Sequence, residues 1–469
     1  MIFAIFTLNC TPIKTTIEED TTPQDDILPV VIIGGGASGM SAAIRLLELG
    51  IEPLILEKES TIGGAGIHAG RFFAVNTILQ SNQNITDSLQ LAAEDWKIFT
   101  GSEADQNVTQ FLSQSAETLS WIESFDVEFD SVQSDIGAGS VPRIHTLSDT
   151  SPHPLAVWEP ELRPYSKINH TVIDIEDHSD FFVVTTSSQS FKTNNIILAT
   201  GGFARNETIV TTHTPAIEQH DWHMESWFGM TGDSIQWLES LSIPLQNMHH
   251  VGLYAHGVTD VTLGFPEVMV VPALERSLIL NQDGIRTFNE HYTQSLYGGQ
   301  LMLQEEALYA IFDAPLWNGT QFQGMGYNYD SPPVLTGSDY AELGTVYQYD
   351  DLRDLAQALE MEVSIMMNSI ATYNTGIQEQ QDAFDKDVST LPPLQTPPFY
   401  AIKLQLSTGK SFGGATVNSV GESTVNNIYV VGESSGFLGT PQVGWGFSGS
   451  ITACYYLGKQ AAEQIAATY

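Results

Sequence analysis

The sequence is poor in cysteine, in basic residues and in long apolar runs. Its 2 cysteines are too few for an iron–sulfur centre or a structural zinc site, so no metal site is expected. No apolar run reaches the roughly 18–20 residues that a membrane helix needs, so no transmembrane span is expected. Lysine and arginine number 17 against 56 aspartate and glutamate residues, for a net charge of −39. So acidic a chain repels phosphate backbones, which argues against a nucleic-acid partner.

The first 28 residues have the character of a signal or tether rather than of a folded domain. Met1–Leu8 is a short apolar run that ends at Asn9 and Cys10, and a polar stretch rich in Thr, Asp, Glu and Pro follows. This order resembles a bacterial lipoprotein signal, in which Cys10 would carry the lipid. It departs from that pattern because no basic residue precedes the run and Asn9 stands where a small residue is usual. Two interpretations stay open: an exported or envelope protein, lipid-anchored at Cys10, and a cytoplasmic protein with a disordered N-terminus.

From residue 29 onward the sequence has the pattern of a strand, a glycine turn, a helix and a second strand. Pro29–Ile33 is apolar and rich in β-branched residues, and a glycine-rich turn leads into a helical stretch that Gly50 closes. Glu52–Glu57 fits a second strand, so the order predicts a βαβ unit of the Rossmann type. Farther along, the pattern predicts helices over roughly 87–125 and 351–376, strands at 171–186 and 195–200, and a final helix from about 448 to 467.

The glycine turn carries the spacing of a dinucleotide-binding motif. Gly34 permits the tight turn, Gly36 lets a pyrophosphate approach the backbone, and Gly39 lets helix and strand pack closely. The free N–H groups and the positive dipole end of the following helix would face the phosphates. Glu57 ends the second strand, where a carboxylate can accept hydrogen bonds from ribose hydroxyls. The unit therefore predicts a bound dinucleotide.

Further segments resemble a flavin site rather than a nicotinamide site. Gly63 and Gly64 follow the second strand and precede a run of small residues, which lets the chain pass along the pyrophosphate and ribityl groups. Ile196–Phe203 contains Ala-Thr-Gly-Gly, and Ile428–Glu433 is a strand that ends in Gly-Glu, whose carboxylate would reach the ribityl or ribose. Small residues from Gly444 then open the last helix, whose N-terminus can point at the pyrimidine end of a flavin.

On these segments the chain resembles the flavoprotein family of fumarate reductases and succinate dehydrogenases, whose relatives include soluble fumarate reductases and 3-ketosteroid dehydrogenases. The resemblance runs almost from end to end after residue 29. Further matching segments are Arg143–His145, Gly229–Asp233, Leu280–Glu290, Pro397–Ala401 and the glycine pair Gly413–Gly414.

The resemblance implies an α/β fold, in which an inserted α+β capping domain interrupts a Rossmann-like FAD-binding domain similar to that of glutathione reductase. It implies residues 29–246 and 409–469 for the FAD-binding domain and 247–408 for the cap. It also implies FAD as the cofactor, held non-covalently, because the position of covalent attachment in succinate dehydrogenases falls on Gly64 and not on the nearby His68. The implied FAD-binding residues are Gly34, Gly36, Ala37, Ser38, Gly39, Glu57, Lys58, Gly63, Gly64, Ala69, Gly70, Val172, Thr200, Gly201, Asp233, Glu433, Ser450 and Ile451.

The substrate-binding cations of that family are largely replaced in this sequence. The proton-donating arginine of the family falls on Gln294, its substrate-binding histidine on Lys410, and its C-terminal clamp arginine near Gln442–Trp445, which contains no arginine. Arginine suits a dicarboxylate because its planar fork binds a carboxylate in a bidentate manner. We therefore expect a small-molecule substrate that is neither fumarate nor another dicarboxylate.

Four residues are candidates for catalysis: Tyr400, Lys410, His256 and Gln294. Tyr400 can serve as a proton donor or acceptor, or its ring can pack between domains. Lys410 can orient a carbonyl or carboxylate by its charge, or lie at the surface. His256 lies close to the position of a substrate histidine in the family, and Gln294 stands in place of the proton donor.

The expected function is an FAD-dependent oxidoreductase of the class that acts on CH–CH donors, with hydride passing between flavin N5 and a CH–CH or C=C bond. Two alternatives stay open: a flavoprotein oxidase or dehydrogenase of another donor, and a flavin electron-transfer protein without catalysis. A disulfide reductase is excluded, because the sequence has no Cys-x-x-Cys and no second GxGxxG motif for NADPH. The sequence does not specify the electron donor or acceptor.

Overall fold

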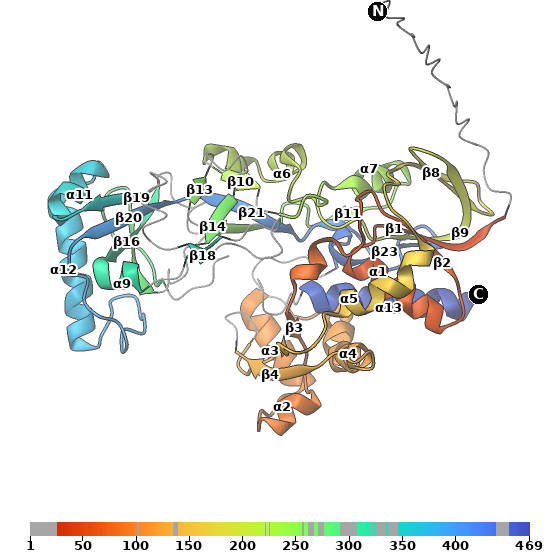
Figure 1. The fold of residues 1–469 in the computed structure, drawn as a ribbon, viewed down its shortest axis with the longest axis horizontal. Helices are drawn as coiled ribbons and strands as arrows, with labels where there is room; N and C mark the ends of the chain where they lie inside the picture. Colours follow the sequence, from red (N-terminus) through yellow and green to blue (C-terminus); the bar gives the residue numbers. More distant parts are fainter. Residues whose placement is uncertain are drawn as a thin grey trace, which may run out of the picture.

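The computed structural model describes residues 26–100, 103–134, 139–220, 222–224, 226–255, 258–260, 267–270, 276–290, 307–319, 322–324, 334–335, 346–437 and 450–469. Figure 1 shows an elongated molecule with two lobes that long strands connect. One lobe holds a large sheet with the first and last helices of the chain, and the other holds a smaller sheet with its own helices.

A seven-stranded sheet forms the core of the first lobe. Its order is β6 (Ser166–Lys167), β2 (Pro53–Leu56), β1 (Leu28–Ile33), β9 (Ser190–Leu198), β8 (Phe182–Thr186) and β7 (Val172–Asp177), and β23 (Ile428–Val430) also pairs with β9. β2, β1, β9 and β23 run parallel, with Ile197 opposite both Ile32 and Tyr429. The carboxyl ends of these strands therefore meet at one edge of the sheet. The predicted βαβ unit and α/β fold are confirmed.

The last helix of the chain packs directly against the first. The helices at this part of the sheet are α1 (Ala37–Glu48), α5 (Pro154–Leu162) and α13 (Ser450–Thr468). A Cβ on Gly458 in α13 would lie 2.3 Å from the carbonyl oxygen of Ser38, so the close approach requires a glycine there. The Ser41 hydroxyl donates to the carbonyl oxygen of Tyr455 at 2.7 Å. Figure 1 shows the two helices together, although they lie at opposite ends of the sequence.

A helical subdomain extends from the first lobe. It contains α2 (Ile78–Asn82), α3 (Leu89–Thr100) and α4 (Gln106–Glu123), with an antiparallel sheet in the order β3 (Arg71–Phe73), β5 (Ile144–Leu147) and β4 (Phe129–Gln133). Asp105 caps α4 by accepting a hydrogen bond from Val108 N–H, and Thr77 and Gln80 form a capping box at α2. The helices predicted over roughly 87–125 are confirmed.

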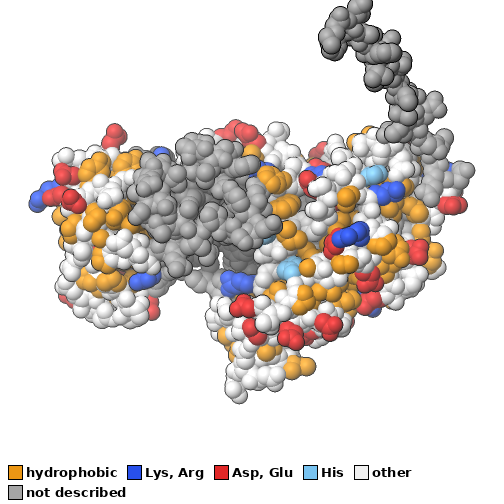
Figure 2. Space-filling view, viewed as in Figure 1, with side chains coloured by type: hydrophobic (Ala, Val, Ile, Leu, Met, Phe, Trp, Pro, Cys, Tyr) orange, Lys and Arg blue, Asp and Glu red, His pale blue; other side chains and the backbone are white. Residues whose placement is uncertain are grey.

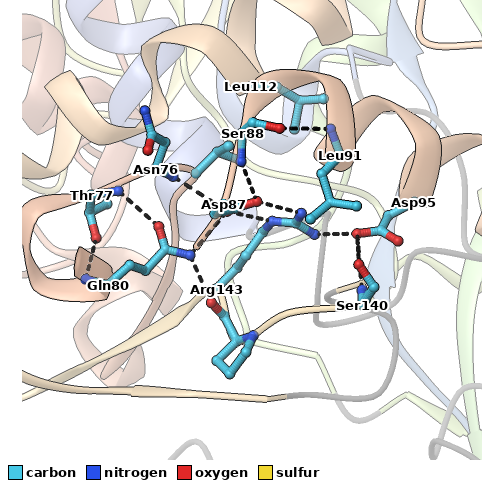
Figure 3. A network of polar contacts seen from close by, with 12 residues as sticks. Asn76, Thr77, Gln80, Asp87, Ser88, Leu91, Asp95, Leu112, Ser140 and Arg143 are labelled. Carbon is cyan, nitrogen blue, oxygen red and sulfur yellow. Dashed lines mark hydrogen bonds and ion pairs between the residues drawn. The ribbon is translucent and has the colours of Figure 1, made fainter. Parts of the chain in front are cut away.

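A buried arginine, Arg143, holds this subdomain together (Figure 3). Its Nη2 and Nε atoms lie 2.7 and 2.8 Å from the carboxylate of Asp87, and its Nη1 lies 2.7 Å from Asp95. Gln80 also donates to Asp87, at 3.0 Å. Burial acts to raise the pKa of Asp87, but the hydrogen bonds from Arg143 and Gln80 outweigh it and hold the pKa below its usual range. The cluster ties α2 and α3 to the loop before β5.

His145 in β5 is buried in the neutral form. Its Nδ1 lies 3.0 Å from the carbonyl oxygen of Arg143 and its Nε2 lies 2.7 Å from the Thr77 hydroxyl. Because a carbonyl oxygen only accepts, Nδ1 carries the proton and Nε2 accepts from Thr77. Burial lowers the pKa of His145 to about 4.

This histidine is expected to make the protein sensitive to acid. The folded state holds the pKa of His145 below the unfolded value, so the unfolded state binds more protons below about pH 6.5 and stability falls as the pH drops from about 6.5 to about 4. The expected loss is on the order of 3 kcal/mol in the free energy of unfolding. His145→Gln should reduce the difference between denaturant unfolding at pH 7 and at pH 4.5, whereas His178→Gln, at an exposed site, should not. An unchanged pH difference in His145→Gln would contradict the assignment.

The second lobe has a sheet and an apolar core of its own. Its antiparallel strand order is β15 (Leu278–Asn281), β16 (Leu308–Asp313), β20 (Phe399–Leu404) and β19 (Val346–Tyr349), with helices α9 (Ala314–Asn318), α11 (Leu352–Ala358) and α12 (Val363–Glu379). Arg286 is buried between Glu290 and Asp382, and Lys386 lies 3.2 Å from Glu290. The helices predicted over 351–376 are confirmed.

Strands from two distant parts of the sequence pair along the connection between the lobes. β11 (Leu245–Gln246) pairs with β22 (Gly414–Ala415), and β21 (Leu406–Ser411) pairs with both β12 (Val251–Ala255) and β10 (Trp222–Met224). A further sheet has the order β13 (Val258–Asp260), β14 (Glu267–Val270), β17 (Phe322–Gly324) and β18 (Val334–Leu335). The predicted cap, 247–408, begins between β11 and β12, but its predicted end falls inside β21. Figure 1 shows β20 and β21 running from one lobe to the other.

Acidic side chains lie on both lobes in the view of Figure 2. Within the described ranges, no helix is long and apolar enough to span a membrane, and no group of three or more His, Cys, Asp and Glu side chains could hold a metal. Cys10, on which the predicted lipid anchor depends, lies outside the described residues.

Candidate cofactor and active site

A cavity of about 540 Å³ lies at the carboxyl ends of β1, β2 and β9. Its volume falls in the range of roughly 300–1,000 Å³ that is usual for small-molecule sites, and this edge is where open α/β sheets bind ligands. The predicted FAD-binding residues that line it are Gly34, Gly36, Ala37, Ser38, Glu57, Lys58, Gly64, Ala69, Val172, Thr200, Gly201, Asp233, Glu433 and Ile451.

Three predicted glycines are not among the residues that line the cavity. A Cβ on Gly39 would lie 2.0 Å from the carbonyl oxygen of Gly34, so Gly39 serves close packing between helix and turn. Gly63 has a φ of 125° and donates its N–H to the carbonyl oxygen of Gly35 at 2.7 Å, which joins the second glycine pair to the first turn. A Cβ on Gly70 would meet no atom within 4 Å, and nothing in the structure explains this glycine.

The first glycine turn is shaped to receive an anion. Gly34 has a φ of 104°, and a Cβ there would lie 2.3 Å from the carbonyl oxygen of Ala199. A Cβ on Gly36 would meet no atom within 4 Å, because this position borders the cavity. α1 begins directly after Gly36 without a side-chain cap, so its first N–H groups are available to a ligand. The residues present therefore fit the pyrophosphate of a dinucleotide.

The Glu57 carboxylate is held in place by the backbone. Its Oε2 accepts from Gly35 N–H at 2.7 Å and its Oε1 accepts from Glu59 N–H at 2.8 Å. Burial raises the pKa of Glu57, and the two N–H bonds act against this rise. Each oxygen keeps a further lone pair for a hydroxyl donor. The predicted contact with ribose stays a prediction.

Lys58 joins the end of β2 to the segment before α7 (Asp233–Ser240). Its Nζ lies 2.8 Å from Asp233 Oδ2, 2.7 Å from Thr231 Oγ1 and 3.1 Å from the carbonyl oxygen of Gly229. Lys58 and Asp233 both line the cavity, so this ion pair forms part of its wall.

Another part of the wall contains Lys410, Glu433 and Cys454. Ser411 N–H donates to Glu433 Oε1 at 2.7 Å. Burial lowers the pKa of Lys410, against the attraction of Glu433, and burial raises the pKa of Glu433. Burial also raises the pKa of Cys454 to about 12, so its thiol is neutral. The structure therefore places Lys410 in the cavity wall rather than on an open surface.

Tyr400 lies apart from the cavity wall. It is in β20 of the second lobe, with 6% of its surface exposed, and its ring stacks on Trp317 at 4.4 Å and 9°. Burial raises the pKa of Tyr400. These contacts show that the ring packs against Trp317 of the same lobe, and a role in proton transfer stays a prediction. His256, Gln294 and Gln442–Trp445 lie outside the described residues, and so does the side chain of Ser450.

The sequence did not indicate several side chains that line the cavity. They are His68, His170, Thr171, Trp227, Phe228, Trp237 and Cys454. Trp227 and Phe228 directly precede the matching segment Gly229–Asp233. No motif in the sequence indicated that their rings would line the cavity.

No arginine contributes to the cavity wall, although all eight lie in the described part of the chain. Arg143 and Arg286 are buried against carboxylates, and Arg45 and Arg163 form ion pairs farther out. Arg205 lies over the ring of Phe228 and is not among the residues that line the cavity. The side chains of the other three, Arg71, Arg276 and Arg353, are exposed.

Comparison with known proteins gives one family and several relatives. The model of the FAD binding domain matches residues 29–446. The chain is 24% identical to an NADH:fumarate oxidoreductase of Klebsiella pneumoniae over 87% of its own length, but it spans 44% of that protein. It is 24% identical to a vinyl phenol reductase of Lactiplantibacillus plantarum, over 95% of this chain and 98% of that protein. The 3-ketosteroid-Δ4-(5α)-dehydrogenase of Rhodococcus jostii RHA1 shares the fold, with a TM-score of 0.73 at 19% identity over 97% and 99% of the two chains.

Proposed function

The chain belongs to the FAD binding domain family, as an FAD-dependent oxidoreductase related to fumarate reductases, and on this premise we propose that it acts on a C=C or CH–CH bond in a substrate that is not a dicarboxylate. Bound FAD supplies the hydride transfer. The chain itself holds the pyrophosphate at Gly36 and the first turn of α1, orients the ribose at Glu57, and presents Lys410 to the substrate.

This proposal rests on the charged side chains that line the cavity. A dicarboxylate needs fixed cations, and none of the arginines lines the cavity. The wall has two lysines, Lys58 and Lys410, against four carboxylates, Glu57, Glu59, Asp233 and Glu433. Lys58 is already paired with Asp233. Among the described residues of the wall this leaves Lys410, one cation for the two carboxylates of a dicarboxylate, whereas a neutral substrate needs no such pair of cations.

The vinyl phenol reductase supports the same conclusion. Its name gives a substrate with a C=C bond and no carboxylate, and it matches this chain over nearly the whole of both proteins. The names of other relatives, the NADH:fumarate oxidoreductase among them, indicate fumarate, so the names alone do not choose the substrate.

The proposal is tested with the purified, anaerobically reduced holoprotein. Flavin reoxidation, followed by absorbance, is expected to be rapid with a neutral vinyl phenol or a steroid-sized enone and undetectable with fumarate. Rapid reoxidation by fumarate would contradict the proposal. Reoxidation by oxygen alone would favour an oxidase of another donor, and no reoxidation by oxygen or by any organic acceptor would favour an electron-transfer protein.

Lys410 is the catalytic candidate that the cavity favours. The lowered pKa of its ammonium group suits a proton donor or acceptor, a role typically worth about 10²–10⁴-fold in rate. Lys410→Met should slow reoxidation by the accepted substrate about 100-fold or more without loss of bound flavin. Lys403→Met, at an exposed position in β20, is the matched control and should retain the full rate. Equal reoxidation rates in the two variants would show that Lys410 takes no part in the reaction.

A further inference from the structure

The segment 226–232 crosses the edge of the cavity without being part of a helix or strand, and hydrogen bonds fix it on both sides. On one side Arg205 donates through Nη1 to the carbonyl oxygen of Ser226 at 2.8 Å, and its backbone N–H donates to Met230 at 3.0 Å. On the other side Lys58 donates to Gly229 and Thr231. The segment is therefore held between the loop after β9 and the end of β2.

Two aromatic rings at the start of this segment line the cavity. Phe228 is 41% exposed, and the Arg205 guanidinium lies 4.7 Å from the centre of its ring. Trp227 is half-buried, and its ring lies 5.5 Å from that of His68, which also lines the cavity. His68 ends the 3₁₀ turn Gly64–His68, which follows the second glycine pair. The Trp227–His68 contact thus connects two segments that are far apart in the sequence.

The hydrogen bonds that hold this segment indicate which part of the dinucleotide lies near Trp227. The segment is bonded to Lys58, the residue directly after Glu57, and Glu57 occupies the position of the ribose-binding carboxylate in a Rossmann βαβ unit. The adenosine half of the cofactor therefore belongs on this side of the cavity. An indole ring offers a broad apolar face to a planar heterocycle.

We propose that Trp227 and His68 form a latch over the adenosine and pyrophosphate part of FAD, which slows release of a cofactor that the sequence predicts to be held non-covalently. Opening of the cavity requires separation of the two rings, while the hydrogen bonds of Arg205 and Lys58 keep the segment in place. The latch requires bound FAD but does not depend on the identity of the substrate.

The test is the rate of FAD release from the holoprotein, measured without substrate by the fluorescence of free flavin after dilution. Trp227→Ala should release FAD at least about tenfold faster than the wild type, and Trp227→Phe should restore part of the retention. His68→Ala should also speed release, and the double variant should add little, because both changes break one contact. Tyr347→Ala, an exposed aromatic residue in β19 of the second lobe, is the control and should leave the rate unchanged.

The absorbance spectrum of the bound flavin distinguishes a ring that covers the adenosine half of FAD from one that covers the isoalloxazine. It should be the same in Trp227→Ala and in the wild type, because the ring covers adenosine and not the isoalloxazine. A shifted spectrum would overturn the assignment to the adenosine half, and an unchanged release rate in both Trp227→Ala and His68→Ala would overturn the latch. Neither outcome depends on whether fumarate or an enone is reduced.

Discussion

Replacement of Gly36 by valine is expected to give a folded protein that does not retain FAD. Gly36 precedes α1 with φ of −76° and ψ of −171°, a conformation open to any residue, and a Cβ there would meet no protein atom within 4 Å. The added side chain would therefore fit the protein and project into the space that a pyrophosphate needs. We expect FAD affinity to fall at least about 100-fold, which corresponds to about 2.7 kcal/mol. The measurements are flavin content after purification, titration of the apoprotein with FAD, and far-UV circular dichroism.

Gly39→Val in the same motif is the contrasting variant. Its Cβ would lie 2.0 Å from the carbonyl oxygen of Gly34, so the backbone of the turn must shift and the whole domain should be destabilised. We expect poor soluble expression or a strongly lowered melting temperature. A Gly36→Val protein that binds FAD normally would show that the cofactor does not approach this turn.

Replacement of Arg143 by methionine is expected to cost about 3–5 kcal/mol of the free energy of unfolding, because it leaves buried carboxylates without their cation. The side chains of Asp87 and Asp95 are 0% and 5% exposed and both bond to Arg143. The wild-type arrangement lowers the pKa of Asp87, so its stabilisation is present above the unfolded pKa and is lost as the pH falls through the folded value. Denaturant unfolding at pH 7 measures the loss.

Arg163→Met provides the control for charge removal. Arg163 pairs with Glu159 on the surface of the protein, where an ion pair contributes about 0–1 kcal/mol. The combined variant Arg143→Met, Asp87→Asn, Asp95→Asn should recover part of the stability, because it removes the buried charges as well. Similar losses for Arg143→Met and Arg163→Met would contradict the account of the buried cluster.

The sequence was sufficient for the βαβ unit because every signal for it is local. The apolar strand, the glycine spacing and the carboxylate at Glu57 are all recognised from residues close by in the chain. The helices predicted at 87–125 and 351–376 are recognised in the same way. The end of the cap has no such local signal. β20 and β21 are almost continuous, so no turn residue marks the point at which the chain returns, and the predicted boundary at 408 falls inside β21.

The predicted cofactor residues lie together, whereas Tyr400, a candidate for catalysis, lies apart from them. Fourteen of the predicted FAD-binding residues line one cavity, since a dinucleotide is held largely by backbone turns that glycine spacing reveals. Tyr400 illustrates the opposite case. Its sequence context allows a proton-transfer role and a packing role alike, and only the neighbouring Trp317, which lies far away in the sequence, favours packing.

Local sequence patterns were enough to predict the dinucleotide turn and the order of the strands and helices around it, and the sequence also shows the shortage of arginine on which the proposed non-dicarboxylate substrate rests. Which side chains share the cavity could be learned only from the folded chain. The folded chain places Lys410 and Cys454 in one wall of the cavity and places the ring of His68 next to that of Trp227. The physical reason is that periodicity and turn chemistry act over a few residues, whereas a cavity wall is set by the packing of segments such as α1 and α13, which the sequence separates by about 400 residues.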